Sequence, residues 1–314
     1  MSARDVDFGR LLTAMVTPFD KRGDVDYKQA ARLAKSLVEN GTDSIVVTGT
    51  TGESPCLSEE EKLRLYQTVK EAIGDRGKVI GGTCNYSTRE SIDLTREAAP
   101  HLDGVLAVVP YYNNPPQEGL YRHFRAIADS TDLPVIVYNV PTRTVRNMDA
   151  STVIRLANDV PNIVGLKEAV GTVGAGLVEQ VTEIVSNVPT SFRVWSGNDS
   201  DTFPIVCLGG YGVVSVASHV VGRQIKKMID LIVTGKVQQA AQLHSHLMPL
   251  AKALFPPVAP VSSPASIKAA LNLQGFDVGG LRLPLIELPE AAQDKLRTLL
   301  ANYQLDHLPV ATPA

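Results

Sequence analysis

The sequence predicts an α/β fold, a (β/α)8 TIM barrel followed by a C-terminal helical region. Eight short runs rich in β-branched residues recur as far as residue 216, and segments with a helical period lie between them. Most runs are continuously apolar, which is typical of strands buried on both faces of a parallel sheet. Eight such strands alternating with helices favour a barrel; a doubly wound open sheet is the alternative. The runs span residues 11–19, 44–49, 78–83, 104–110, 134–139, 162–167, 192–197 and 212–216.

The helical segments have recognisable beginnings and ends. Gly41 ends the first helix. Ser58 can cap the second, with Glu61 three residues later as in a capping box, and Gly74 ends it. Only residues 198–210 separate the last two strands, so we expect the helix between them to be short.

Strand signals stop after the eighth run. We therefore expect a catalytic barrel over residues 1–233 and a C-terminal helical domain over residues 234–314. The Pro-rich stretch 256–264 is interpreted as a connection within the second domain. Helical patterns in this domain cover residues 236–255, 263–275 and 289–304.

Charge and composition exclude several classes of function. The net charge is −3, without a cluster of Lys and Arg, so we expect no nucleic-acid partner. The charged N-terminus lacks the apolar core of a signal peptide, and no apolar run reaches the roughly 18 residues of a membrane span. Three cysteines without a CxxC spacing, Cys56, Cys84 and Cys207, are expected to be buried, reduced thiols. The sequence thus predicts a cytoplasmic protein without a membrane partner.

Reactive side chains follow five of the predicted strands. In barrel enzymes the active site lies at the carboxyl ends of the strands, so these residues should meet at one mouth. They occupy positions 50–53, 111–113, 138–143, 167–168 and 196–199.

Lys167 is the most informative of these residues. The apolar run 163–166 leads directly into it. A neutral lysine amine can attack a ketone to give a Schiff base, which serves as an electron sink for carbon–carbon bond chemistry. Because an ordinary lysine is neutral in only about one molecule in a thousand near pH 7.4, such a role requires apolar surroundings or suitable neighbours. A lysine paired with a carboxylate at the barrel mouth is the alternative.

Three further groups can serve the same chemistry. The phenol of Tyr138 could transfer protons, although the residue could simply line the barrel. The GTTGE segment, residues 49–53, offers backbone N–H groups and two hydroxyls for a small carboxylate, or is only a tight turn. Arg143 could bind a second carboxylate, or be a surface arginine.

Metal and cofactor sites are not expected. The segment 210–215 lacks the last glycine of a dinucleotide fingerprint and leads into a strand. His244 and His246 are two residues apart on a predicted helix, so they point to different faces.

Five motifs in order carry a resemblance to a known family. They are GTTGES, PYYNNPPQEGLYRHF, YNVPTRT, GLKEA and GYGVVSV. Together they resemble the dihydrodipicolinate synthase/N-acetylneuraminate lyase superfamily of class I aldolase-type barrels, over nearly the whole chain. The arginine in YNVPTRT makes the chain most similar to the dihydrodipicolinate synthase branch, since the sialic acid lyases lack it there.

The resemblance implies a role for each residue. Lys167 would form a Schiff base with pyruvate, and the loop of Thr50 and Thr51 would hold the pyruvate carboxylate. Tyr138, Thr50 and Tyr112 would relay protons, with Tyr112 reaching in from a neighbouring subunit of a homotetramer built from tight dimers.

The second substrate implied by the resemblance is L-aspartate 4-semialdehyde. Arg143 would bind its carboxylate, while Gly197 and Val214 would shape the pocket through their backbones. The implied product is 4-hydroxy-tetrahydrodipicolinate, on the route to diaminopimelate and lysine. A related pyruvate aldolase acting on a 2-keto-3-deoxy sugar acid, and a non-catalytic barrel that binds a metabolite, are the alternative functions.

The sequence departs from lysine-inhibited members of the family. Those carry histidines after GTTGES and an asparagine after the third strand, where this chain has Glu59, Lys62 and Tyr86. The usual NPIPVK stretch reads SPASIK here. Because a like-charged Lys62 would repel the ammonium of lysine or occupy its place, we expect weak or absent inhibition by lysine. Three other residues still match those of the lysine-inhibited members: Ser54, Glu90 and Tyr111.

Overall fold

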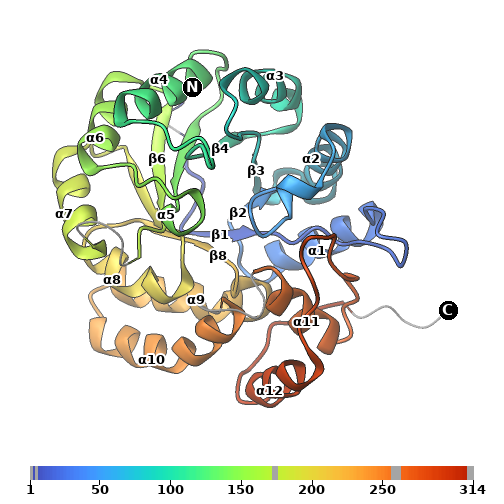
Figure 1. Ribbon diagram of the computed structural model, residues 1–314. Coiled ribbons are helices and arrows are strands. Elements are labelled where there is room, and N and C mark those ends of the chain that lie inside the picture. Colours follow the sequence, from blue (N-terminus) through green and yellow to red (C-terminus); the bar gives the residue numbers. More distant parts are fainter. Residues whose placement is uncertain (1–2, 4–5, 172–175, 256–262, 310–314) are drawn as a thin grey trace.

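The protein forms a closed parallel barrel, as predicted (Figure 1). The computed structural model describes residues 3, 6–171, 176–255 and 263–309. Each strand pairs in parallel with its neighbour in the chain, and β8 closes the barrel against β1. The strands are β1 Leu11–Ala14, β2 Ser44–Val47, β3 Lys78–Gly81, β4 Gly104–Val108, β5 Val135–Asn139, β6 Ile163–Glu168, β7 Arg193–Ser196 and β8 Gly212–Ser215.

Helices surround the barrel, and in the described part of the C-terminal region three more helices follow (Figure 1). Between the barrel and its helices, apolar residues of strands and helices form two buried clusters. None of the helices in the described ranges has both the length and the apolar character of a membrane span. The helices are α1 Tyr27–Glu39, α2 Glu59–Ile73, α3 Thr88–Ala98, α4 Gln117–Ala128, α5 Pro141–Thr144, α6 Ala150–Asp159, α7 Leu177–Asn187, α8 Thr202–Cys207, α9 Ser218–Val233, α10 Val237–Leu254, α11 Ala265–Leu273 and α12 Glu290–Leu300.

Local signals in the sequence set several helix ends. The Ser58 hydroxyl accepts from the Glu61 N–H, the Glu61 carboxylate accepts from the Ser58 N–H, and Gly74 caps the end of α2 at a positive φ. This confirms the capping box. The helix between the last two strands, α8, has six residues, as the short connection requires.

The expectation for the cysteines was partly wrong. All three thiols are free, but Cys56 and Cys84 are only half-buried and Cys207 is exposed. Cys207 is the last residue of α8, and the buried positions of that short helix are taken by Thr202, Ile205 and Val206.

The C-terminal helices pack onto the barrel. Leu250 of α10 and Ile267 of α11 belong to the same apolar cluster as Leu11 of β1. The division into domains 1–233 and 234–314 stays a prediction, and the Pro-rich connection falls outside the described residues except for its last two.

An irregularity in β6 decides which residues face the barrel interior. Val135 of β5 pairs with Ile163, but Ile136 pairs with Gly165, so β6 contains one extra residue. Beyond this bulge Tyr138 is the register partner of Lys167. Since register partners project to the same side of a sheet, and Tyr138 belongs to the interior cluster, Lys167 also faces the interior.

Candidate active site

Lys167 is buried at the mouth end of β6. Its side chain is 5% exposed, and its Nζ lies 4.0 Å from the centroid of the Tyr138 ring. Within the described ranges, none of the ion pairs involves Lys167. The ion-paired role left open by the sequence is therefore not seen there, and the lysine has the apolar, aromatic surroundings that suit an amine nucleophile.

A cleft opens at the mouth beside these residues. It is bounded by the loop after β2, by the end of β4, and by the segment that follows β5. Thr50, Tyr138 and Arg143 line it, so the structure brings together three of the residues selected from the sequence. The other lining residues are Thr48, Gly49, Ser54, Pro55, Gly82, Cys84, Leu106, Val108, Tyr111, Val140 and Thr144.

The loop after β2 is a compact turn with two unused donors. The N–H groups of Gly52 and Glu53 donate to the carbonyls of Gly49 and Thr50, at 3.0 and 3.1 Å. Among the described residues, the N–H groups of Thr50 and Thr51 donate to no acceptor. The loop can therefore offer adjacent backbone N–H groups to a small anion.

Close contacts fix the shape of this turn. A Cβ at Gly52 would come within 3.1 Å of the Met15 carbonyl, so only glycine fits without movement. The Thr17 hydroxyl donates to the Gly52 carbonyl at 2.7 Å. Thr51 is buried, whereas Thr50 is half-buried at the cleft.

The remaining predicted residues lie at different places around the mouth. Arg143, on the short helix α5, is exposed, and its guanidinium lies 5.4 Å from the Phe255 ring centroid. Tyr112 is 95% exposed and is not part of the described cleft lining. Gly197 directly follows β7, and Val214 lies within β8. Neither residue is part of the described cleft lining.

Space around Gly197 is restricted. A Cβ there would lie 2.7 Å from Ala169 Cβ, and the Gly197 N–H donates to the Glu168 carbonyl at 2.6 Å. Val214 is 1% exposed within the barrel interior. Both positions can shape the interior through main chain and packing.

Glu168 points away from the barrel interior into a polar network. Its carboxylate accepts from Asn139 Nδ2 at 2.9 Å and from Gln180 Nε2 at 2.8 Å. Asn147 extends the network, since it contacts both amide side chains at 2.8 and 3.0 Å. Burial raises the pKa of Glu168 to about 7, against the opposing effect of these hydrogen bonds. The network ties β5 and β6 to the segment that follows Arg143.

This pKa predicts a pH-dependent stability. The folded value of about 7 lies above the ordinary value of 4.5, so protonated Glu168 stabilises the fold below pH 4.5, and this contribution is lost as pH rises to 7. The free energy of unfolding should fall by about 3 kcal/mol over this range. Urea unfolding between pH 4.5 and 8 should show this decrease in the free energy of unfolding. A Glu168→Gln variant should not show it. Equal slopes with pH in both proteins would contradict the prediction.

Asp199 fixes the turn between β8 and α9. Its partly buried carboxylate accepts from the N–H groups of Val216 and Ala217, at 3.0 and 2.9 Å, and from the Ser215 hydroxyl. Burial raises the pKa of its carboxyl group, and these hydrogen bonds oppose the rise.

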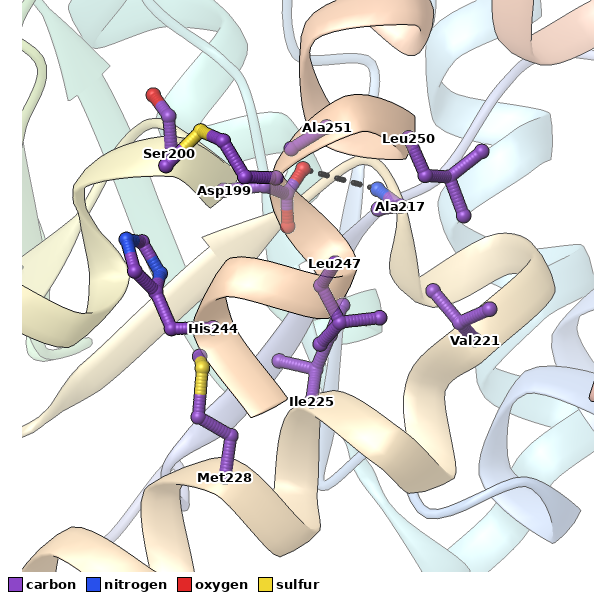
Figure 2. A pocket seen from close by; sticks show the side chains of 11 residues that line it. Asp199, Ser200, Ala217, Val221, Ile225, Met228, His244, Leu247, Leu250 and Ala251 are labelled. Carbon is purple, nitrogen blue, oxygen red and sulfur yellow. Dashed lines mark hydrogen bonds between the residues drawn. The ribbon is translucent and has the colours of Figure 1, made fainter. Parts of the chain in front are cut away.

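Figure 2 shows a second pocket beside Asp199, between α9 and α10. Asp199, Ser200 and His244 contribute to its wall, but the rest is mainly apolar side chains, such as Leu247 and Ile225. Such walls are suited to packing rather than to carbonyl chemistry. The barrel mouth therefore remains the candidate active site.

Sequence reasoning missed two groups near the site. Cys84 lines the cleft, and Lys268 of α11 forms a buried ion pair with Glu53 of the loop after β2. The only signal for the second contact was a lysine in an otherwise apolar helical pattern, at the end of SPASIK.

The fold is that of a (β/α)8 barrel, and its mouth holds a buried lysine beside a tyrosine ring. The model of the dihydrodipicolinate synthetase family matches residues 7–303. The chain belongs to the dihydrodipicolinate synthetase family.

Named relatives are similar over nearly their whole length. A 4-hydroxy-tetrahydrodipicolinate synthase of Dehalococcoides mccartyi is 52% identical over 305 residues, which cover 97% of this chain and 99% of the relative. One from Symbiobacterium thermophilum is 52% identical over 296 residues, covering 94% and 98%. The crystal structure of DHDPS from Cyanidioschyzon merolae with lysine bound superposes with a TM-score of 0.89 at 46% identity, covering 94% of this chain and 98% of that one.

Proposed function

We propose that this protein is a lyase that condenses pyruvate with L-aspartate 4-semialdehyde to 4-hydroxy-tetrahydrodipicolinate. The observation that carries the proposal is 52% identity, over 97% of the chain, to a relative of that name. The presence of Lys167 beside Tyr138 supports it, because the reaction proceeds through a Schiff base. We assign the protein to the diaminopimelate route of lysine biosynthesis and to the cytoplasm.

The first half of the reaction activates pyruvate. The Lys167 amine adds to the keto carbon, and loss of water leaves an imine. Loss of a methyl proton then gives an enamine. Tyr138 would supply and remove protons in these steps, because it lies in the cleft with its ring 4.0 Å from Lys167 Nζ.

The second half forms the carbon–carbon bond and the ring. The enamine carbon attacks the aldehyde, whose oxygen takes up a proton. The amino group of the former semialdehyde then attacks the imine carbon, and the ring closes as the C–N bond to Lys167 breaks. The lysine leaves as a free amine, so no cofactor is consumed.

Two groups would bind the substrate carboxylates. The unused N–H groups of Thr50 and Thr51 suit the pyruvate carboxylate. Arg143 at the cleft suits the carboxylate of the semialdehyde, which a guanidinium can bind with two hydrogen bonds. Gly197 and Val214 would limit the space around the bound pyruvate.

Tyr112 fits this function only in an assembly. Its side chain is 95% exposed and its φ is +73°, so the backbone holds an unfavourable conformation to present a ring to solvent. We infer that Tyr112 completes the proton relay with Thr50 and Tyr138 in the cleft of a neighbouring copy, within a homotetramer of two tight dimers.

The coupled assay with dihydrodipicolinate reductase tests the proposal. Pyruvate and aspartate semialdehyde together should give NADPH oxidation, and each alone should not. Borohydride reduction in the presence of pyruvate should add one pyruvate-derived mass to Lys167. Turnover with a 2-keto-3-deoxy sugar acid, but not with the semialdehyde, would favour the sugar-acid aldolase instead.

Inhibition by lysine should be weak or absent. Lys62 lies within electrostatic range of Glu59 and Glu90, and its burial lowers its pKa while these carboxylates oppose that effect. A cation already present beside Glu90 would repel the ammonium of the effector. Millimolar L-lysine should therefore change the rate by less than about twofold. Strong inhibition in a lysine titration at that concentration would contradict this.

A further inference from the structure

The C-terminal region contacts the carboxylate-binding loop through a buried ion pair. Lys268 Nζ on α11 lies 2.6 Å from Glu53 Oε1, and the two side chains are 1% and 0% exposed. Glu53 closes the GTTGE turn, directly after the segment with the unused N–H groups.

Both partners are held from several sides. Lys268 Nζ also donates to the Gly280 carbonyl at 2.7 Å and lies 4.1 Å from the centroid of the Phe19 ring. The second oxygen of Glu53, Oε2, accepts from the Arg282 N–H at 3.0 Å. Apart from this ion pair, Glu53 Oε1 has no hydrogen-bond partner among the described residues, so the carboxylate depends on Lys268 for that oxygen.

Arg282 extends this contact to the rest of the loop. Its guanidinium binds Glu61 of α2 with two hydrogen bonds, at 2.6 and 2.7 Å, and donates to the Cys56 carbonyl at 2.9 Å. The chain from Glu53 to the start of α2 is thus fixed at both ends by the C-terminal region.

The backbone at Glu53 depends on this support. Its φ is +58°, in the left-handed region that non-glycine residues rarely adopt. Glu53 is not among the described residues that line the cleft, so we relate its position to the loop rather than to chemistry on a substrate. Burial lowers the pKa of Lys268 to about 8, against the opposing charge of Glu53, so Lys268 remains mostly protonated at neutral pH.

We propose that Lys268 and Glu53 are positioning residues that hold the Thr50 and Thr51 N–H groups in the geometry that binds the pyruvate carboxylate. This inference rests on the proposed function. It assigns a specific task to the C-terminal helices, since α11 supplies the cation. Loss of either charge leaves the other buried without its ion-pair partner, and the turn must move to expose it to water.

Steady-state kinetics of four variants test the proposal. Glu53→Gln and Lys268→Met should each raise the KM for pyruvate by about tenfold or more, with the KM for aspartate semialdehyde within about twofold of wild type. The double variant should have a lower pyruvate KM than either single variant, because no unpaired charge remains. Lys252→Met, at an exposed lysine of α10, is the matched control and should behave as wild type.

Two further readouts separate positioning from mere destabilisation. Glu53→Asp keeps both charges but shortens the reach to Lys268, so it should fold and still raise the pyruvate KM several-fold. The inference would be overturned if the pyruvate KM were unchanged in the folded single variants and in Glu53→Asp. It would also be overturned if the KM values for pyruvate and for aspartate semialdehyde rose equally. In both cases the borohydride trapping of pyruvate by the wild-type protein still succeeds, so the proposed function stands. Failure of that trapping in wild type would instead overturn the proposed function, and this inference with it.

Discussion

Replacement of Lys167 by alanine is expected to abolish covalent capture of pyruvate and to reduce turnover by roughly 10⁴-fold or more. The reason is that neither the imine nor the enamine can form without this amine. Lys167 is 5% exposed and lies against the Tyr138 ring, so its removal deletes a nucleophile and leaves both Thr50 and Arg143 at the cleft. Borohydride reduction followed by intact-mass measurement gives the first readout, and the reductase-coupled assay gives the second.

The control for this variant replaces a surface lysine far from the barrel mouth in the sequence. Lys295→Ala, at an exposed position of α12, should keep both the adduct and the activity of wild type. Circular dichroism should show that Lys167→Ala keeps its fold. A pyruvate adduct on the folded Lys167→Ala protein would show that another amine is the nucleophile, and the mechanism proposed for this site would then be wrong.

The barrel could be predicted from the sequence because burial on both faces leaves a simple pattern. The continuous apolar runs gave the eight strands, and the capping signals at Ser58 and Gly74 gave the bounds of α2. Lys167 stood out because it follows such a run. These are local signals, set by hydrophobicity and hydrogen bonding within a few residues.

The direction in which Lys167 points could not be read from the same pattern. A continuously apolar strand does not reveal which residues face inward. Continuing the pairing of Val135 with Ile163 without the bulge would place Leu166, not Lys167, opposite Tyr138. A single extra residue in β6 therefore brings the amine into the barrel, and such an irregularity depends on the packing of neighbouring strands.

The ion pair between Glu53 and Lys268 was hidden for a different reason. Its partners lie far apart in the sequence and meet only when α11 packs against the barrel. The role proposed for Tyr112 depends on a neighbouring copy, because its side chain is 95% exposed in a single chain. Contacts of this kind depend on tertiary and quaternary structure, which periodicity does not encode.

Tyr138→Phe is expected to slow turnover by roughly 10²-fold, the usual effect of losing a general acid–base group, while the fold and the binding of pyruvate are retained. The variant keeps the aromatic ring whose centroid lies 4.0 Å from Lys167 Nζ and removes only the hydroxyl, so the change isolates proton transfer from packing. The adduct with pyruvate should therefore still form under borohydride, but more slowly, and the KM for pyruvate should change by less than about threefold. Tyr303→Phe, which loses a hydroxyl that donates to the His246 carbonyl at 2.9 Å, is the matched control and should have wild-type kinetics. Wild-type turnover in Tyr138→Phe would mean that the proton is carried by another group, and the relay through Thr50 would need a different donor.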